Sequence, residues 1–194
     1  MLRGFDPILA VTLAPEDAFE LWQIPLFILL GVLCGLMAWY FTSMNSRVGG
    51  FFKGIDRQWK KWMWGGAILG VLIFIFPPLY GEGYEGFTAL MHGNTQVLFD
   101  NSLFYRFRDI DWVVILFIIA TMFFKVIAMA STNAAGGVGG TFAPSLFVGA
   151  FTGATLALVC NMLFQWDVSV VSFTLVGMAG VMSGGMNAPL TSIF

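Results

Sequence analysis

Residues 135–149 read AGGVGGTFAPSLFVG, and this stretch decides how the chain can fold. Glycines stand at positions 136, 137, 139 and 140, followed by Pro144, inside an uncharged run between Lys125 and Asp167. Glycine lowers helix stability, and proline cannot donate a backbone hydrogen bond. In hydrocarbon, each unpaired backbone group costs several kcal/mol. The stretch therefore predicts a break between two helices, where the backbone is buried in protein or faces water.

The composition around that stretch is that of a membrane protein. Of 194 residues, 58% are hydrophobic and only 10% are charged, and the mean hydropathy is +0.84. Soluble domains carry about 25% charged residues. One core in a protein of this size could not bury so much apolar surface, so we expect the lipid bilayer to be a partner. The net charge of −2 gives no indication of nucleic-acid binding.

Long uncharged segments predict the membrane helices, because spanning requires roughly 20 apolar residues. One span is expected to begin near Pro25, within residues 21–46. A second covers 62–78 and is ended by Pro77 and Pro78, and a third runs from Asp111 to about residue 130.

Further helices are expected from about Pro144 and from Val170, and Pro189 would start another that the sequence does not complete. The prediction is an all-α, polytopic membrane helix bundle over residues 21–194 that is incomplete in its architecture. Residues 1–20 are expected to form a non-spanning segment.

The loops predict the orientation of the chain. The segment 47–61 carries five basic residues, whereas the segment 82–111 carries two basic residues among five acidic ones. The positive-inside rule therefore places the loop 47–61 in the cytoplasm. Trp59, Trp62 and Trp64 are typical of interface anchors. A patch around Arg57 that binds nucleic acid or lipid is the alternative.

Glycines also indicate how the helices pack. Pairs at four-residue spacing occur at 31/35, 66/70, 149/153 and 180/184, and such pairs favour close helix contact in membranes. In the acidic loop, Gly81, Gly83 and Gly86 predict a tight bend into a short helix at 86–93, which is too short to span and is typical of a re-entrant element.

Soluble ligand-binding motifs do not fit the glycine stretch. A Walker loop requires Gly-Lys-Ser/Thr, but Gly140 is followed by Thr141, and a dinucleotide fingerprint needs a small residue where Phe142 stands. The first turn of a helix presents unpaired N–H groups and about half a positive charge, which suits weak binding of an anion. A hinge or packing break between two helices remains the alternative.

The segment GGTFAP, residues 139–144, resembles the GxFxP anion-filter motif of the CLC chloride channels and proton-coupled anion exchangers. MNAPLTSIF near the end resembles the family's R-A-P-L-T-G segment, with Asn187 in place of the basic residue, and Lys125 stands where the family often has an arginine. The resemblance covers residues from about 20 to the end. It implies an inverted-repeat fold with broken and re-entrant helices, of which this chain is much of the second repeat.

The resemblance also implies a site and partners. Thr141 and Phe142 would donate backbone N–H groups to chloride, Gly139 and Gly140 would permit its approach, and Ala143 and Pro144 would begin the helix. The hydroxyl of Thr141 has helix capping as its alternative role. The gating glutamate and the inner-gate tyrosine would lie outside this chain. A homodimer, a missing first repeat and an inner-membrane location follow from the resemblance alone.

Other functions find little support in the residues. No paired carboxylates share a membrane helix, so we expect no enzyme, no catalytic residue and no cofactor. Cys34 and Cys160 are expected to be buried thiols, and His92 has no partner histidine for a metal site. Lys125 lies inside an apolar run, where snorkelling or pairing to a loop acid is the expected explanation. A membrane scaffold and a secondary transporter of another family are the alternatives to anion transport.

Overall fold

The computed structural model describes residues 21–81, 86, 90, 98, 99, 102, 104–107 and 110–186. Within these residues every regular element is helical, which confirms the all-α prediction. The segment 1–20 and the helix expected at Pro189 lie outside the described residues. So does the short helix expected at 86–93, except for Gly86 and Leu90, which are helical.

Helix α1, Ile24–Lys53, begins at the predicted place and ends later than expected. Pro25 occupies its first turn, where the missing N–H has no intrahelical partner in any case. The helix continues through residues that we assigned to the cytoplasmic loop, so Arg47 and Lys53 lie in its last turns. No proline interrupts this segment, and the helix stops only at Gly54.

Helix α2, Gln58–Ile75, corrects the prediction of a second span. It starts four residues earlier, in the basic segment, and it ends before Pro77, where the 3-10 turn η3, Pro77–Leu79, follows. Three helices of the described chain are long and apolar enough to cross a membrane: α1 with its leading turn, α4 and α5. Helix α2 is not among them, because its first turn carries two lysines and the prolines limit its length.

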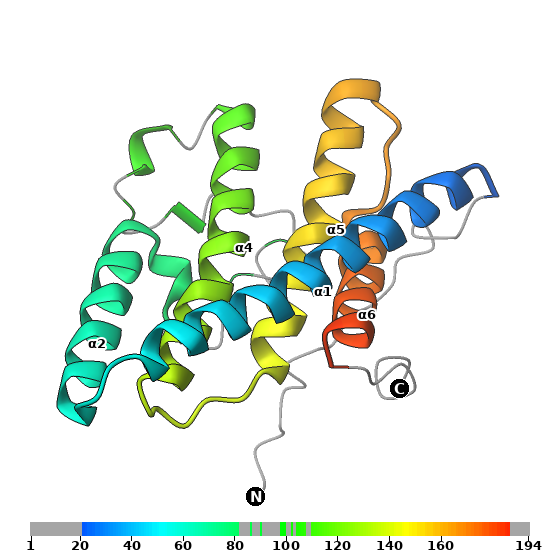
Figure 1. Ribbon diagram of the computed structural model, residues 1–194. Coiled ribbons are helices and arrows are strands. Elements are labelled where there is room, and N and C mark those ends of the chain that lie inside the picture. Colours follow the sequence, from blue (N-terminus) through cyan, green and yellow to red (C-terminus); the bar gives the residue numbers. More distant parts are fainter. Residues whose placement is uncertain are drawn as a thin grey trace, which may run out of the picture.

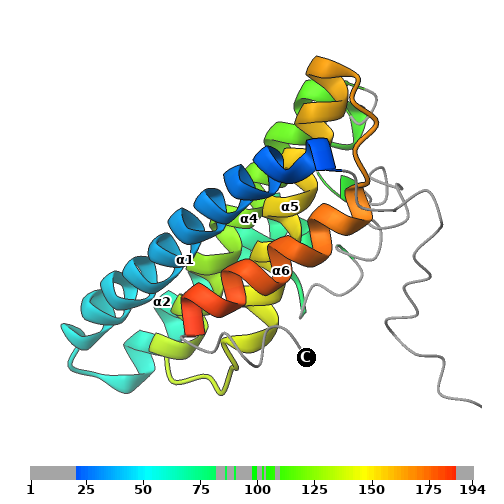
Figure 2. The ribbon, with the colours of Figure 1, turned by 90° about the vertical axis from the view of Figure 1, so that its right-hand side faces the viewer.

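Helices α4, Asp111–Ala134, and α5, Phe142–Phe164, confirm the predicted third span and the helix near Pro144. Helix α6, Val170–Met186, confirms the one expected from Val170. Helix α1 runs diagonally across α4, α5 and α6, and α2 stands beside α4 (Figure 1). After a turn of 90°, α6 lies in front of α5 (Figure 2). The core lies between these helices, and Phe147 and Phe151 of α5 stack in it with ring centroids 4.0 Å apart.

Glycine pairs bring the helices of the core together, as predicted, at two of the four positions. A Cβ on Gly149 or Gly153 of α5 would collide with the backbone of α6, at Gly177 and Phe173 respectively. A Cβ on Gly180 of α6 would lie 3.0 Å from Cys34, and one on Gly184 would lie 2.9 Å from Ala38. The two residues of α1 are themselves four positions apart, so small residues face each other across both helices.

The other two pairs do not pack in this way. A Cβ on the pair 31/35 in α1 or the pair 66/70 in α2 would meet no described atom within 4 Å. The prediction of tight packing is therefore wrong for these two pairs within the described residues. Identical spacing in the sequence thus corresponds to a closed helix contact in one place and an open helix face in another.

Gly153→Ala tests the α5–α6 contact. The added methyl would have to displace the backbone at Phe173, and overpacking of this kind costs about 1–3 kcal/mol. We expect the full-length protein to show a lower thermal midpoint in detergent, measured by loss of the folded peak in size-exclusion chromatography. Gly35→Ala is the matched control, since its methyl has open space and alanine favours helix. Equal midpoints for the two variants would contradict the contact.

Candidate functional site

The site begins where α4 ends, at the glycine stretch. Gly136 has a φ of +99°, a left-handed conformation that favours glycine. A Cβ there would lie 2.6 Å from the side-chain nitrogen of Gln58, which donates a 3.2 Å hydrogen bond to the carbonyl of Ala135. The end of α4 is thus tied to the start of α2, and the chain turns there instead of continuing as one helix.

Helix α5 then begins with exposed backbone donors. Thr141 flanks its first residue, and its carbonyl accepts a 3.1 Å hydrogen bond from the amide of Ser145. No described residue accepts a hydrogen bond from the amide of Thr141, Phe142 or Ala143. The Thr141 side chain makes no capping hydrogen bond, which corrects the capping alternative. Unpaired N–H groups and the helix dipole therefore give this end a positive potential.

Gly139 and Gly140 lie on the path to the backbone amides at the start of α5. The path is narrow at Gly139 and open at Gly140. A Cβ on Gly139 would lie 2.6 Å from Oδ1 of Asn133, so any larger residue there would require the Asn133 side chain to move. A Cβ on Gly140 would have one neighbour within 4 Å, the amide nitrogen of Phe142 at 4.0 Å. Gly140 therefore borders the unpaired donors directly, and its lack of a side chain leaves them accessible.

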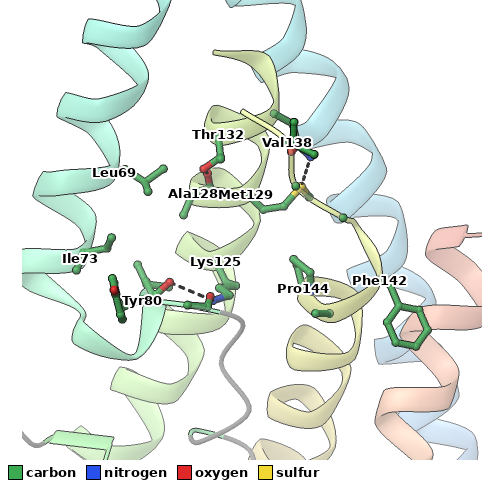
Figure 3. Close-up of a pocket in the computed structure, with 16 residues that line it drawn as sticks. Leu69, Ile73, Tyr80, Lys125, Ala128, Met129, Thr132, Val138, Phe142 and Pro144 are labelled. Atoms are coloured by element: carbon green, nitrogen blue, oxygen red, sulfur yellow. Dashed lines mark hydrogen bonds between the residues drawn. The ribbon is translucent and has the colours of Figure 1, made fainter. Parts of the chain in front are cut away.

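A cavity of about 570 Å³ adjoins this helix end, between α2, α4 and the start of α5 (Figure 3). Five of the six predicted site residues line it, and Thr141 does not: the five are Gly139, Gly140, Phe142, Ala143 and Pro144. The ring of Phe142 points away from the cavity, whereas Pro144 lies on the side of Lys125. The structure thus brings most of the predicted residues to one cavity, with the Phe142 ring outside it.

Lys125 of α4 lines the same cavity and is buried, with only 3% of its surface exposed. Its ammonium donates hydrogen bonds of 3.0 Å to the carbonyl of Leu79 and 2.8 Å to that of Gly81, and it lies 4.9 Å from the ring centroid of Phe147. The snorkelling explanation is therefore wrong, because the charge points into the protein. The acids of the 82–111 loop have no described side chains, so pairing with one of them stays a prediction.

Sequence reasoning missed the walls of the cavity. Leu69 and Ile73 of α2 form one wall, and Asn133 of α4 forms part of another. The Asn133 side chain donates to the sulfur of Met129, and its Oδ1 is buried with no partner in the described structure. A polar residue three positions before the first glycine of the run was the one available signal. That α2 forms a wall of the cavity depends on tertiary packing, and no local sequence pattern indicates it.

The described residues contain no group of three or more potential metal ligands. Cys34 and Cys160 are free and buried, as expected.

A family model described as voltage gated chloride channel matches residues 1–194, the whole chain. The chain belongs to this family. The resemblance of GGTFAP and its surroundings to CLC proteins is therefore confirmed. The three long apolar helices and the family membership together make it an integral membrane protein.

Relatives within the CLC family include both channels and exchangers. Chloride channel protein CLC-e of Arabidopsis thaliana is 31% identical over 187 residues, which cover 88% of this chain and 24% of the relative. The H(+)/Cl(-) exchange transporter ClcA of Salmonella paratyphi B is 28% identical over 200 residues, which cover the whole chain and 38% of the relative. The ClcA of Salmonella typhimurium matches to the same extent. The chain thus spans well under half the length of these CLC relatives.

Lys125→Met tests whether the buried cation of this CLC chain holds the η3 turn against α4. The change removes the Lys125 donor from the carbonyls of Leu79 and Gly81. The Leu79 bond is buried, and a buried unsatisfied group costs roughly 1–3 kcal/mol. We expect a lower thermal midpoint for the full-length protein, with partial recovery in Lys125→Arg, which keeps the charge and the donors. An unchanged midpoint in Lys125→Met would show that these bonds contribute little.

Proposed function

We propose that this chain takes part in transmembrane anion transport, with chloride as the ligand and no cofactor. The single observation that supports the proposal is the entrance of α5. There, the amides of Thr141 and Phe142 have no acceptor among the described residues, and the same helix end borders a cavity with a buried cation. Gly139 and Gly140 permit the approach of the ion, and Ala143 and Pro144 form the first helical turn.

The energetics of such a site suit permeation. Partial charges on amides bind an anion more weakly than a full cation in direct contact would, and an ion that crosses a membrane must also leave each site. Lys125 fits this requirement, because its ammonium is held by two carbonyls. Its field reaches the cavity, while its hydrogen bonds go to the protein. The chain therefore attracts an anion in two ways: through the amide dipoles at the start of α5, and through the Lys125 ammonium, which is already hydrogen-bonded to two carbonyls.

The names of the relatives support the same function in general terms. One relative is named a chloride channel and another an H(+)/Cl(-) exchange transporter, and neither name describes an enzyme. We therefore propose a transport role without enzymatic chemistry. We further propose that the active unit includes a first repeat supplied by the same full-length protein, and that it forms a homodimer in the inner membrane with the 47–61 segment in the cytoplasm.

The scaffold alternative predicts a different environment for the glycine stretch. If the glycines served only packing, the loop between α4 and α5 would be closed against neighbouring helices, as Gly149 and Gly153 are. Gly136 and Gly139 do have a close side-chain neighbour, but Gly140 is exposed and a Cβ on it would meet only the amide nitrogen of Phe142, at 4.0 Å. This contrast favours a ligand-facing role for the loop.

Bromide diffraction tests the site directly. We expect crystals of the full-length protein soaked in bromide to show an anomalous peak within hydrogen-bond distance of the amide nitrogens of Thr141 and Phe142. A map with no peak there, in crystals that show bromide elsewhere, would contradict the proposed site.

Gly140→Leu tests the function of the same site in transport. A Cβ at this position would have one neighbour within 4 Å, the amide nitrogen of Phe142 at 4.0 Å, and we expect the rest of the leucine side chain to cover that amide. Loss of one hydrogen bond to a charged group weakens binding by roughly tenfold to a hundredfold, so we expect a comparable loss of chloride flux in proteoliposomes. Gly31→Leu, on an open face of α1, is the matched control and should keep its flux. Unchanged flux in Gly140→Leu would favour the scaffold alternative.

A further inference from the structure

The junction of α1 and α2 exposes a group of cations and aromatic rings that the proposed function does not use. We call it the elbow. Its cations outnumber its acids by five to one, and four large apolar side chains are exposed beside them. The elbow consists of Arg47, Phe51, Lys53, Arg57, Trp59, Lys60, Lys61, Trp62 and Trp64, with Asp56 as its acid.

The charges of the elbow are not balanced within the described chain. No ion pair joins any of these cations to another described residue. Arg57 and Lys60 are exposed. The ammonium of Lys60 lies 6.0 Å from the ring centroid of Trp59, the outer limit for a cation–π contact. The exposed cations therefore fit a partner that carries negative charge.

An open apolar face continues from the elbow along α2. Trp59, Met63, Gly66, Gly70 and Phe74 recur at intervals of three or four residues, so they share one face of the helix. All five are exposed, and a Cβ on either glycine would meet nothing within 4 Å. The face is thus a shallow trough at the two glycines, with Met63 and Phe74 beyond its ends.

The length of this face matches one leaflet of a bilayer. From Lys60 to Phe74 the helix rises about 21 Å, and one leaflet including its headgroup region is about 20–22 Å thick. A phosphate at the cationic end and an acyl chain along the trough would therefore both have a place on α2. Nucleic acid fits less well, because it would leave the apolar part of the face without a partner.

We propose that the elbow and the trough of α2 form a docking site for an anionic phospholipid of the cytoplasmic leaflet. Arg57 and Lys60 hold the headgroup phosphate. One acyl chain lies over Gly66 and Gly70. Trp59 stands at the level of the headgroups, where an aromatic ring with a polar N–H is favoured. The site is separate from the cavity at the start of α5, so this proposal does not depend on anion transport.

Native mass spectrometry of the full-length protein tests the headgroup contact, with dioleoyl phosphatidylglycerol and dioleoyl phosphatidylcholine as the two probes. We expect tighter binding of the anionic lipid. Removal of each surface charge weakens attraction to anionic lipid by about fivefold, so Arg57→Gln with Lys60→Gln should lower the affinity by about twenty-fivefold. Arg106→Gln, an exposed cation outside the elbow, is the control and should keep the affinity.

Gly70→Leu tests the trough without changing any charge. We expect it to weaken binding of the dioleoyl lipid severalfold and to leave dihexanoyl phosphatidylglycerol, whose chains are too short to fill the trough, unchanged. Gly31→Leu is the control on an equally open helix face.

Three outcomes would overturn the proposal. One is the absence of any preference for the anionic lipid. Another is an equal loss of affinity in Arg106→Gln, because the attraction would then be a property of the whole surface. The third is a change of oligomeric state in Gly70→Leu, since a protein helix rather than a lipid would then cover the trough.

Discussion

The requirement that backbone N–H and C=O groups be paired away from water governs this chain. Inside hydrocarbon only continuous helices meet it without help, and α1, α4 and α5 do so over most of their lengths. The exception is the connection between α4 and α5, where the chain turns at Gly136 and re-enters at Phe142. The donors left over at that point are a cost to folding. They are also the donors that we propose to bind an anion.

The surrounding packing makes that break possible. Gly149, Gly153 and Gly177 let α5 and α6 approach until their backbones are in contact, which holds α5 in place. Lys125 acts on the other side, because it binds two carbonyls around the η3 turn and faces Phe147 of α5. A rigid helix pair and a buried charge therefore define the position of the cavity. The helix entrance is preorganised by residues that do not themselves reach the proposed ion site.

Local patterns predicted the helices well where one signal dominated. Long uncharged segments predicted α1, α4 and α5, and Pro25, Pro77 and Pro144 predicted where helices start or stop. The errors arose where charge and helix propensity gave opposite indications. Arg47 and Lys53 indicated a loop, yet the backbone remained helical as far as Gly54, and the lysines at the start of α2 shortened the apolar part of a helix that we expected to span.

By itself, the sequence determined that this is a membrane protein of the CLC family with a helix break at residues 135–141, because composition, hydrophobic run length and the GGTFAP motif are all local properties. Only the tertiary structure decided which glycine pairs are contacts and which are open, since the pairs 149/153 and 66/70 have the same spacing and opposite surroundings. It also decided that Lys125 points inward and that the Phe142 ring turns away from the cavity. Such outcomes depend on which helix lies opposite, and spacing within one helix carries no information about its neighbour.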